Sequence, residues 1–136
     1  MLKKTLLERA QTLFYNMINP KLGLTKATTD STYVFLVNLP YGIEPAAFAA
    51  SRHFSSKFLM SGIAAKLCQD MAKIKNPFLA YGLGLALPFF FSNAIMLSVH
   101  YLGGTPKPLE SIILSNITGL TMTPLITYGT RKGYMD

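Results

Sequence analysis

The sequence predicts an all-α integral membrane protein, in which four transmembrane helices form a small bundle preceded by an amphipathic interfacial helix. Half of the 136 residues are hydrophobic and 14% are charged, whereas soluble domains average about a quarter charged residues. The mean hydropathy is +0.31. Lys and Arg outnumber Asp and Glu by 13 to 6 and are scattered singly between apolar runs. Because these basic residues are not clustered, they form no nucleic-acid-binding patch. Their surplus is instead typical of the topology of a membrane protein.

The first expected element is an amphipathic helix over residues 2–18. Its apolar residues recur at helical spacing, and Lys3, Lys4 and Arg9 lie elsewhere on the helical wheel. Such a helix suits the headgroup plane of a bilayer. Its apolar run is too broken for a signal-peptide core, so we expect the segment to be retained. Residues 19–23 predict a turn that ends it, which divides the chain into an interfacial segment (1–26) and a transmembrane domain (27–136).

Four spans are expected, over residues 31–50, 54–74, 78–102 and 111–130. A membrane-crossing helix needs about 20 apolar residues, and residues 78–102 are 25 residues without Asp, Glu, Lys or Arg. Residues 54–74 carry four charges, including Lys57, Lys66 and Asp70, and, taken alone, are also compatible with an interfacial helix. Their place between neighbours of span length favours a partly buried second span.

The distribution of basic residues predicts that both termini are cytoplasmic, in the cytoplasmic (inner) membrane. Cytoplasmic loops carry an excess of Lys and Arg. With four spans, the side holding the termini has ten basic residues and the other side has three. The ten are Lys3, Lys4, Arg9, Lys21, Lys26, Lys66, Lys73, Lys75, Arg131 and Lys132, and the three are Arg52, Lys57 and Lys107.

Two Ser-Asn pairs interrupt the most apolar stretches. Ser92-Asn93 and Ser115-Asn116 have no charged residue close to them, and Asn38 lies in the first expected span. An amide without hydrogen-bond partners in hydrocarbon costs several kcal/mol. Hydrogen bonds between helices would satisfy these groups, but such bonds are worth only about 0.6 kcal/mol on average. We therefore expect the five side chains to line the path of a small polar solute.

The acidic residues of the spans are the candidate proton carriers. Glu44 and Asp70 are the principal candidates, with Asp30 and Arg52 beside the path, because ionisable groups in spans normally face the bundle interior. Asp30 and Glu44 are spaced to share one face of a single helix. The expected ion pairs are Asp70 with Lys66, and Glu44 with Arg52 or Lys57. The alternative is that these acids lie at span ends, in water or among headgroups.

Proline breaks three of the expected spans, at Pro40, Pro88 and Pro124. A proline inside a helix leaves the carbonyl four residues earlier without its donor. The carbonyls released in this way are those of Leu36, Gly84 and Leu120. Transporters use such breaks near the midplane to build solute sites, although a simple packing kink is the alternative.

Small residues recur every fourth position in the last span, as Ser115, Gly119, Thr123 and Thr127. This spacing lets two helix backbones approach closely. The ridge either seats the last helix in its own bundle or joins two copies of the chain.

The remaining residues predict neither an enzyme nor a cofactor site. His53 and His100 lack metal-ligand spacing with other His, Cys or carboxylate residues, and Cys68 excludes a disulfide framework. Neither a Walker-type phosphate loop nor a nucleophile elbow occurs.

The order of these features resembles the bacterial L-alanine exporter family (AlaE), over about residues 30–132. The likeness consists of Asp30 and an apolar span reaching Glu44, then Arg52 in "SRHF", and Asp70 closing the second span. It continues through Pro88, "GG", Ser115-Asn116 and "YGTRK" (128–132). The resemblance implies a four-span inner-membrane protein that exports a small neutral amino acid using the proton gradient, as an oligomer.

We therefore expect a proton-coupled exporter of a small polar solute such as L-alanine, working in a lipid bilayer as a homo-oligomer. The principal alternative is a structural or accessory subunit of a larger membrane complex, with other membrane subunits as partners. A holin-like or channel-forming oligomer is a third possibility.

Overall fold

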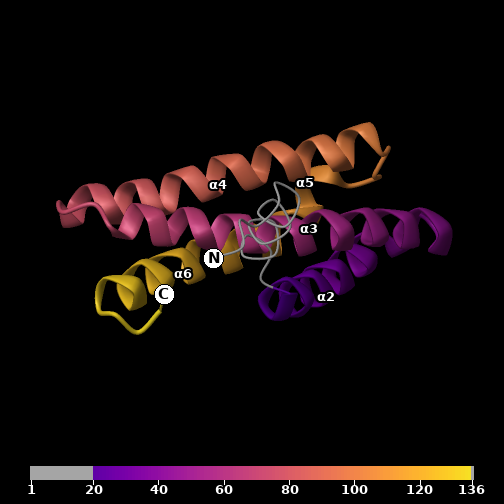
Figure 1. The fold of residues 1–136 in the computed structure, drawn as a ribbon. Coiled ribbons are helices and arrows are strands. Elements are labelled where there is room, and N and C mark those ends of the chain that lie inside the picture. The colour runs from indigo at the N-terminus through magenta and orange to yellow at the C-terminus, as the bar shows by residue number, and fades with distance from the viewer. Residues whose placement is uncertain (1–19, 136) are drawn as a thin grey trace, which may run out of the picture.

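The computed structural model describes residues 20–135, which form a bundle of antiparallel helices (Figure 1). The elements are α2 (Pro20–Asn38), the 3-10 turn η1 (Leu39–Tyr41), α3 (Ile43–Ala72), α4 (Pro77–Leu102), α5 (Pro108–Ser111) and α6 (Ile113–Arg131). No strand occurs in this range, so the predicted all-α class is confirmed. The expected interfacial helix (2–18) lies outside the described residues. The turn expected at 19–23 is wrong, because α2 already begins at Pro20.

The two longest helices form a hairpin that sets the length of the bundle. α3 and α4 have 30 and 26 residues, so at a rise of 1.5 Å per residue they are about 45 and 39 Å long. α2 folds back along the first half of α3, and α6 lies against α3 and α4 toward the other end (Figure 1). α2 and α6 meet near the middle of α3, where the Lys26 side chain of α2 reaches Thr118 of α6.

The chain reverses direction at residues 39–42, inside the expected first span (31–50). Pro40 ends α2 because its ring is incompatible with a continuing helix. Gly42 then adopts a φ of 115°, a value that residues other than glycine rarely adopt. Asp30 and Glu44 therefore lie on two different helices. The expectation that they share one helical face is wrong, and Pro40 makes a turn where a kink was expected.

α3 is longer than the expected second span. It runs unbroken from Ile43 to Ala72, whereas a loop was expected at residues 51–53. The later expectations agree better with the structure: α4 matches 78–102, and α6 matches most of 111–130. Asn76 caps α4 by accepting a hydrogen bond from the Leu79 amide at 3.3 Å, as N-cap residues do.

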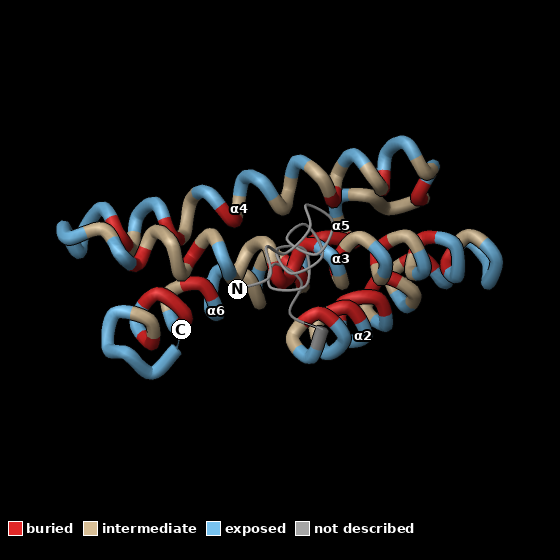
Figure 2. The backbone as a smooth tube through the Cα atoms, in the orientation of Figure 1, coloured by how far each residue is buried: buried red, intermediate tan, exposed pale blue. Residues whose placement is uncertain are grey.

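Among the described residues, two segments are long and apolar enough to cross a membrane, 77–102 and 108–131. Most of their residues are not buried within the chain. Figure 2 shows the outer face of α4 as largely exposed, with its buried positions turned toward the other helices. Phe78 is 85% exposed, Phe90 70% and Leu102 90%. α4 therefore exposes apolar side chains on its outer face and also buries some against the other helices.

Small residues bring α6 close to α4. A Cβ atom added at Gly84 would lie 2.8 Å from the Thr127 hydroxyl oxygen, so only glycine fits between the two helices. Ser115, Thr123 and Thr127 of the predicted ridge are buried. Gly119 differs, because a Cβ atom there would have no other atom within 4 Å. The close contact expected at Gly119 is absent.

The Gly84–Thr127 contact makes Gly84→Ala destabilising. The added methyl group would push apart α4 and α6, and overpacking of this kind typically costs about 1–3 kcal/mol. We expect a lower thermal midpoint in detergent, measured by circular dichroism. Gly82→Ala is the matched control, since Gly82 lies on the same helix with open space around it. Equal midpoints for the two variants would show that the α4–α6 contact is looser than described.

Candidate functional site

A buried lysine lies at the centre of the bundle. Lys57 on α3 is 5% exposed, and its Nζ lies 3.7 Å from Oδ2 of Asp30 on α2. The same ammonium donates a hydrogen bond to the hydroxyl of Ser115 on α6. Three helices that are distant in sequence thus converge on one charge.

A second lysine adds to the positive charge of this region. Lys26 on α2 is half-buried, and its Nζ donates to the Thr118 hydroxyl at 2.7 Å. Asp30 is 1% exposed and its Oδ2 lacks a hydrogen-bond partner. The two ammonium groups face a single carboxylate, so a small anionic group would be attracted to the site.

These lysines border a pocket among α2, α3, α4 and α6. Its cavity volume, taken as the space open to the centre of a water molecule, is about 60 Å³, and the pocket is partly open to the outside. Apolar residues make up most of the wall, including Leu85 and Phe89. Its polar lining comprises Lys26, Lys57, Ser61, Ser92, Asn93, Ser115, Asn116 and Thr123. A mostly apolar pocket with a few convergent polar groups is the usual form of a small-molecule site.

The structure brings both predicted Ser-Asn pairs to this one pocket. Asn93 donates to the Phe89 carbonyl of its own helix, with 2.9 Å between Nδ2 and O. Within residues 20–135, the Asn93 side chain makes no hydrogen bond to another helix. This geometry leaves the Asn93 oxygen as an acceptor for a solute.

The helix break predicted at Pro88 also lies at the pocket. α4 continues through Pro88, and the freed Gly84 carbonyl accepts a hydrogen bond from Cys68 at 3.2 Å. Cys68 thus replaces the amide donor that proline lacks. Pro124 lies within α6 and does not line the pocket.

Asn38 is placed away from the pocket, at the turn between α2 and α3. Its Nδ2 donates to the Val34 carbonyl and to the Ser111 hydroxyl, each at 2.9 Å. Its Oδ1 accepts from the Lys107 amide at 3.0 Å. All the polar atoms of this side chain are used to join α2 to α5, and none faces the solute pocket.

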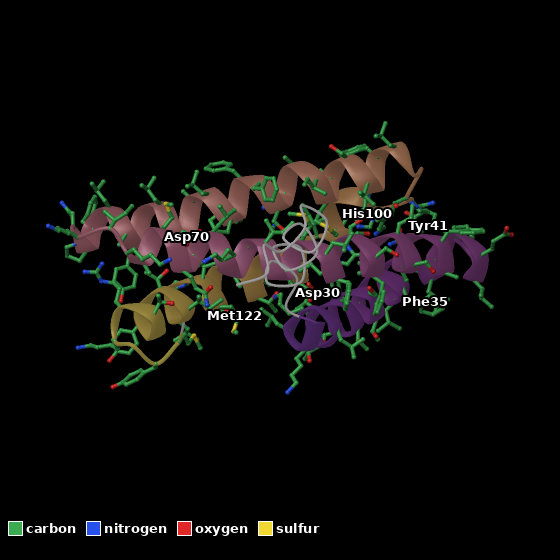
Figure 3. The ribbon with its side chains drawn as sticks, viewed as in Figure 1. Asp30, Phe35, Tyr41, Asp70, His100 and Met122 are labelled. Carbon is green, nitrogen blue, oxygen red and sulfur yellow. The ribbon has the colours of Figure 1, made fainter. Side chains whose placement is uncertain are left out.

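The two principal proton-carrier candidates are also separate from the pocket. Glu44 is exposed in the first turn of α3, and its expected pairing with Arg52 or Lys57 is wrong because Lys57 faces Asp30. Figure 3 places Asp30 near the middle of the bundle and Asp70 toward the end where α3 meets α4. The expected pair of Asp70 with Lys66 is present, at 3.2 Å, and Lys73 adds a second contact at 3.0 Å.

The sequence interpretation missed the buried histidines. His53 and His100 are both fully buried, and Nδ1 of His53 lies 2.8 Å from Nε2 of His100. Within residues 20–135, no three His, Cys, Asp or Glu side chains are placed to hold a metal ion. The available signal was the four-residue spacing of His53, Lys57 and Ser61, which puts polar groups on one face of α3.

Comparison of the chain with protein families, with characterised proteins and with solved structures finds no match. The site therefore has to be interpreted from its own geometry and charge.

Removing one partner of the buried Lys57–Asp30 pair should be strongly destabilising. Lys57→Met leaves the Asp30 carboxylate uncompensated, which typically costs about 3–5 kcal/mol. We expect a large fall in the thermal midpoint in detergent, and partial recovery in the double variant Lys57→Met/Asp30→Asn.

Lys66→Met is the matched control for this experiment. Lys66 pairs with Asp70, but the side chains are 45% and 43% exposed, and such surface pairs contribute about 0–1 kcal/mol. If Lys57→Met and Lys66→Met unfold at the same temperature, the Lys57 ammonium is not part of a buried network.

Proposed function

We propose that the chain is a small membrane transporter that exports a small neutral amino acid, such as L-alanine, in exchange for protons. The observation that carries this proposal is the central pocket. Two Ser-Asn pairs from α4 and α6 line it together with Lys57, which is ion-paired with Asp30. These groups offer both signs of charge and several neutral hydrogen-bonding atoms to one small solute.

The lengths and surfaces of the helices support a bilayer location. α3 and α4 are comparable to the thickness of a bilayer with its headgroups, about 40–45 Å. The exposed aromatic and aliphatic side chains of α4 suit contact with lipid. Under this proposal α3 and α4 cross the inner membrane together, and α2 and α6 each pack along one half of this hairpin. Lys73, Lys75 and Arg131 lie at one end of the bundle, which the positive-inside rule assigns to the cytoplasm.

The pocket chemistry matches the two charges of an amino acid. A substrate carboxylate would bind the ammonium of Lys57, and the substrate ammonium would bind Oδ2 of Asp30, which is ion-paired with Lys57 but accepts no hydrogen bond in the described residues. Such charge-assisted hydrogen bonds are the stronger ones. The hydroxyl of Ser92 and the amide oxygen of Asn93 would then orient the solute, while a short side chain would fit the apolar wall. Size and orientation would both select a small amino acid.

Asp30 couples the solute to protons in this scheme. Protonation of its carboxylate removes the negative charge that holds the substrate ammonium, so proton and substrate exclude each other. Mutually exclusive binding is the requirement for exchange of one against the other. Glu44 and Asp70 are exposed or half-exposed, whereas Asp30 is buried and ion-paired with Lys57, which lines the pocket. The coupling role that the sequence assigned to them is therefore proposed for Asp30.

Filling the pocket should stop transport without unfolding the protein. Gly119 borders the pocket and has open space around it, so Gly119→Leu would place a branched side chain where the solute binds. We expect export of labelled L-alanine from preloaded cells to be lost. Gly82→Leu is the matched control. Gly82 is exposed on α4 and has open space around it, so this variant should export normally. Normal export by Gly119→Leu at normal expression would exclude the pocket as the path.

The coupling residue can be identified by comparing Asp30→Asn with Glu44→Gln. Each change keeps a hydrogen-bonding side chain but removes the carboxylate. Because Asp30 is buried and ion-paired with the pocket residue Lys57, whereas Glu44 is exposed, we expect Asp30→Asn to abolish accumulation driven by a pH gradient and Glu44→Gln to retain it. The measurement is uptake of labelled L-alanine into proteoliposomes. The opposite outcome would return the coupling role to Glu44.

A further inference from the structure

The histidine pair belongs to a chain of buried polar groups that the transport scheme does not yet use. His100 on α4 contacts His53 through Nε2, and its Nδ1 lies 2.9 Å from the Thr105 hydroxyl oxygen. Thr105 lies in the connection between α4 and α5 and is 6% exposed. The labelled His100 lies toward the end of the bundle where α4 finishes (Figure 3). The chain thus leads from a connection at one end of the bundle into its core.

The inner end of this chain faces the proposed coupling site. Nε2 of His53 is buried and has no hydrogen-bond partner in the described part of the protein. Lys57 follows one helical turn later on the same face of α3, and Asp30 on α2 lies beside Lys57. The next ionisable groups beyond His53 are therefore those of the pocket.

Two positive charges flank the pair. Lys57 acts on His53, and Arg52 acts on His100 while its guanidinium approaches the Thr105 hydroxyl at 3.5 Å. Within residues 20–135, no carboxylate is hydrogen-bonded to either ring. A third positive charge is disfavoured between two cations. A proton entering the pair would therefore be passed on to an acceptor and would not stay there.

We propose that Thr105, His100 and His53 form a proton path from the α4–α5 connection to the Lys57–Asp30 pair. This inference rests on the proposed proton-coupled transport. In the proposed orientation the α4–α5 connection faces the outside of the cell, so protons would enter there and move inward along the gradient.

Each step of the path conserves protons. A neutral imidazole has one N–H donor and one bare nitrogen acceptor. A proton taken up at Nδ1 of His100 is balanced by transfer of the Nε2 proton to Nδ1 of His53. His53 then releases its own Nε2 proton toward the carboxylate of Asp30. One proton enters, one leaves, and both rings end in the opposite tautomer, which rotation of the two rings resets.

The test separates substrate exchange from proton-driven accumulation. The purified chain is reconstituted in proteoliposomes containing a pH-sensitive dye, with labelled L-alanine as the probe. Exchange of internal for external alanine at equal pH needs no net proton movement, whereas accumulation against a gradient does. We expect His53→Gln and His100→Gln to exchange at the rate of the parent and to lose gradient-driven accumulation by about tenfold or more, as for lost proton-transfer groups.

A milder variant keeps the test decisive if the histidine variants fail to fold. Thr105→Val keeps the shape of the side chain but removes the hydroxyl at the outer end of the path, so we expect slower gradient-driven accumulation with unchanged exchange. Thr121→Val is the matched control, because its hydroxyl bonds only to carbonyls of its own helix and is exposed.

The outcomes distinguish the path from the transporter itself. Parental accumulation by Thr105→Val, or by folded His53→Gln and His100→Gln, overturns the proton path and leaves the transporter proposal standing. Loss of exchange together with accumulation in every folded variant also overturns it, because the residues would then serve the substrate site. A parent protein that neither exchanges nor accumulates L-alanine contradicts both proposals.

Discussion

The buried ammonium of Lys57 is the constraint on which the arrangement of the helices depends. A charge held in a low-dielectric interior without partners costs several kcal/mol, so the fold must bring polar groups to it. α2 supplies Asp30 and α6 supplies Ser115. Both shorter helices must therefore pack against the middle of α3. The same requirement places the polar pocket there, since Lys57 and its partner Ser115 both line the space between the four helices.

The breaks and small residues of the chain make this convergence sterically possible. Gly42 allows α2 to fold back on α3 through its positive φ, and Gly84 allows α6 to approach α4. Pro88 costs α4 one backbone donor, which the thiol of Cys68 replaces at the Gly84 carbonyl. These residues have little polar chemistry of their own in common. Together they let the helices pack closely enough for the buried polar groups to form hydrogen bonds.

The polar core has two parts with different roles in the proposed scheme. The pocket side has free hydrogen-bonding capacity, because Oδ2 of Asp30 has no hydrogen-bond partner. The turn side is closed, because Asn38 uses its whole amide to join α2 to α5. A group with unused capacity can accept a solute or a proton, whereas a satisfied one mainly stabilises the fold. The histidine pair forms a third polar group, in which His100 contacts both His53 and the Thr105 hydroxyl.

The sequence by itself determined the helical class, the position of α4, most of α6 and the polar character of the Ser-Asn pairs. Each of these follows from local composition: long uncharged runs form helices, and isolated amides in them stand out. Only the tertiary structure decided that Lys57 faces Asp30, that Glu44 is exposed, and that the chain reverses at Pro40. Ion pairing across helices depends on contacts between residues far apart in sequence, and helical periodicity cannot specify which faces meet. The pocket is therefore a property of packing, assembled from residues whose individual polarity the sequence already displayed.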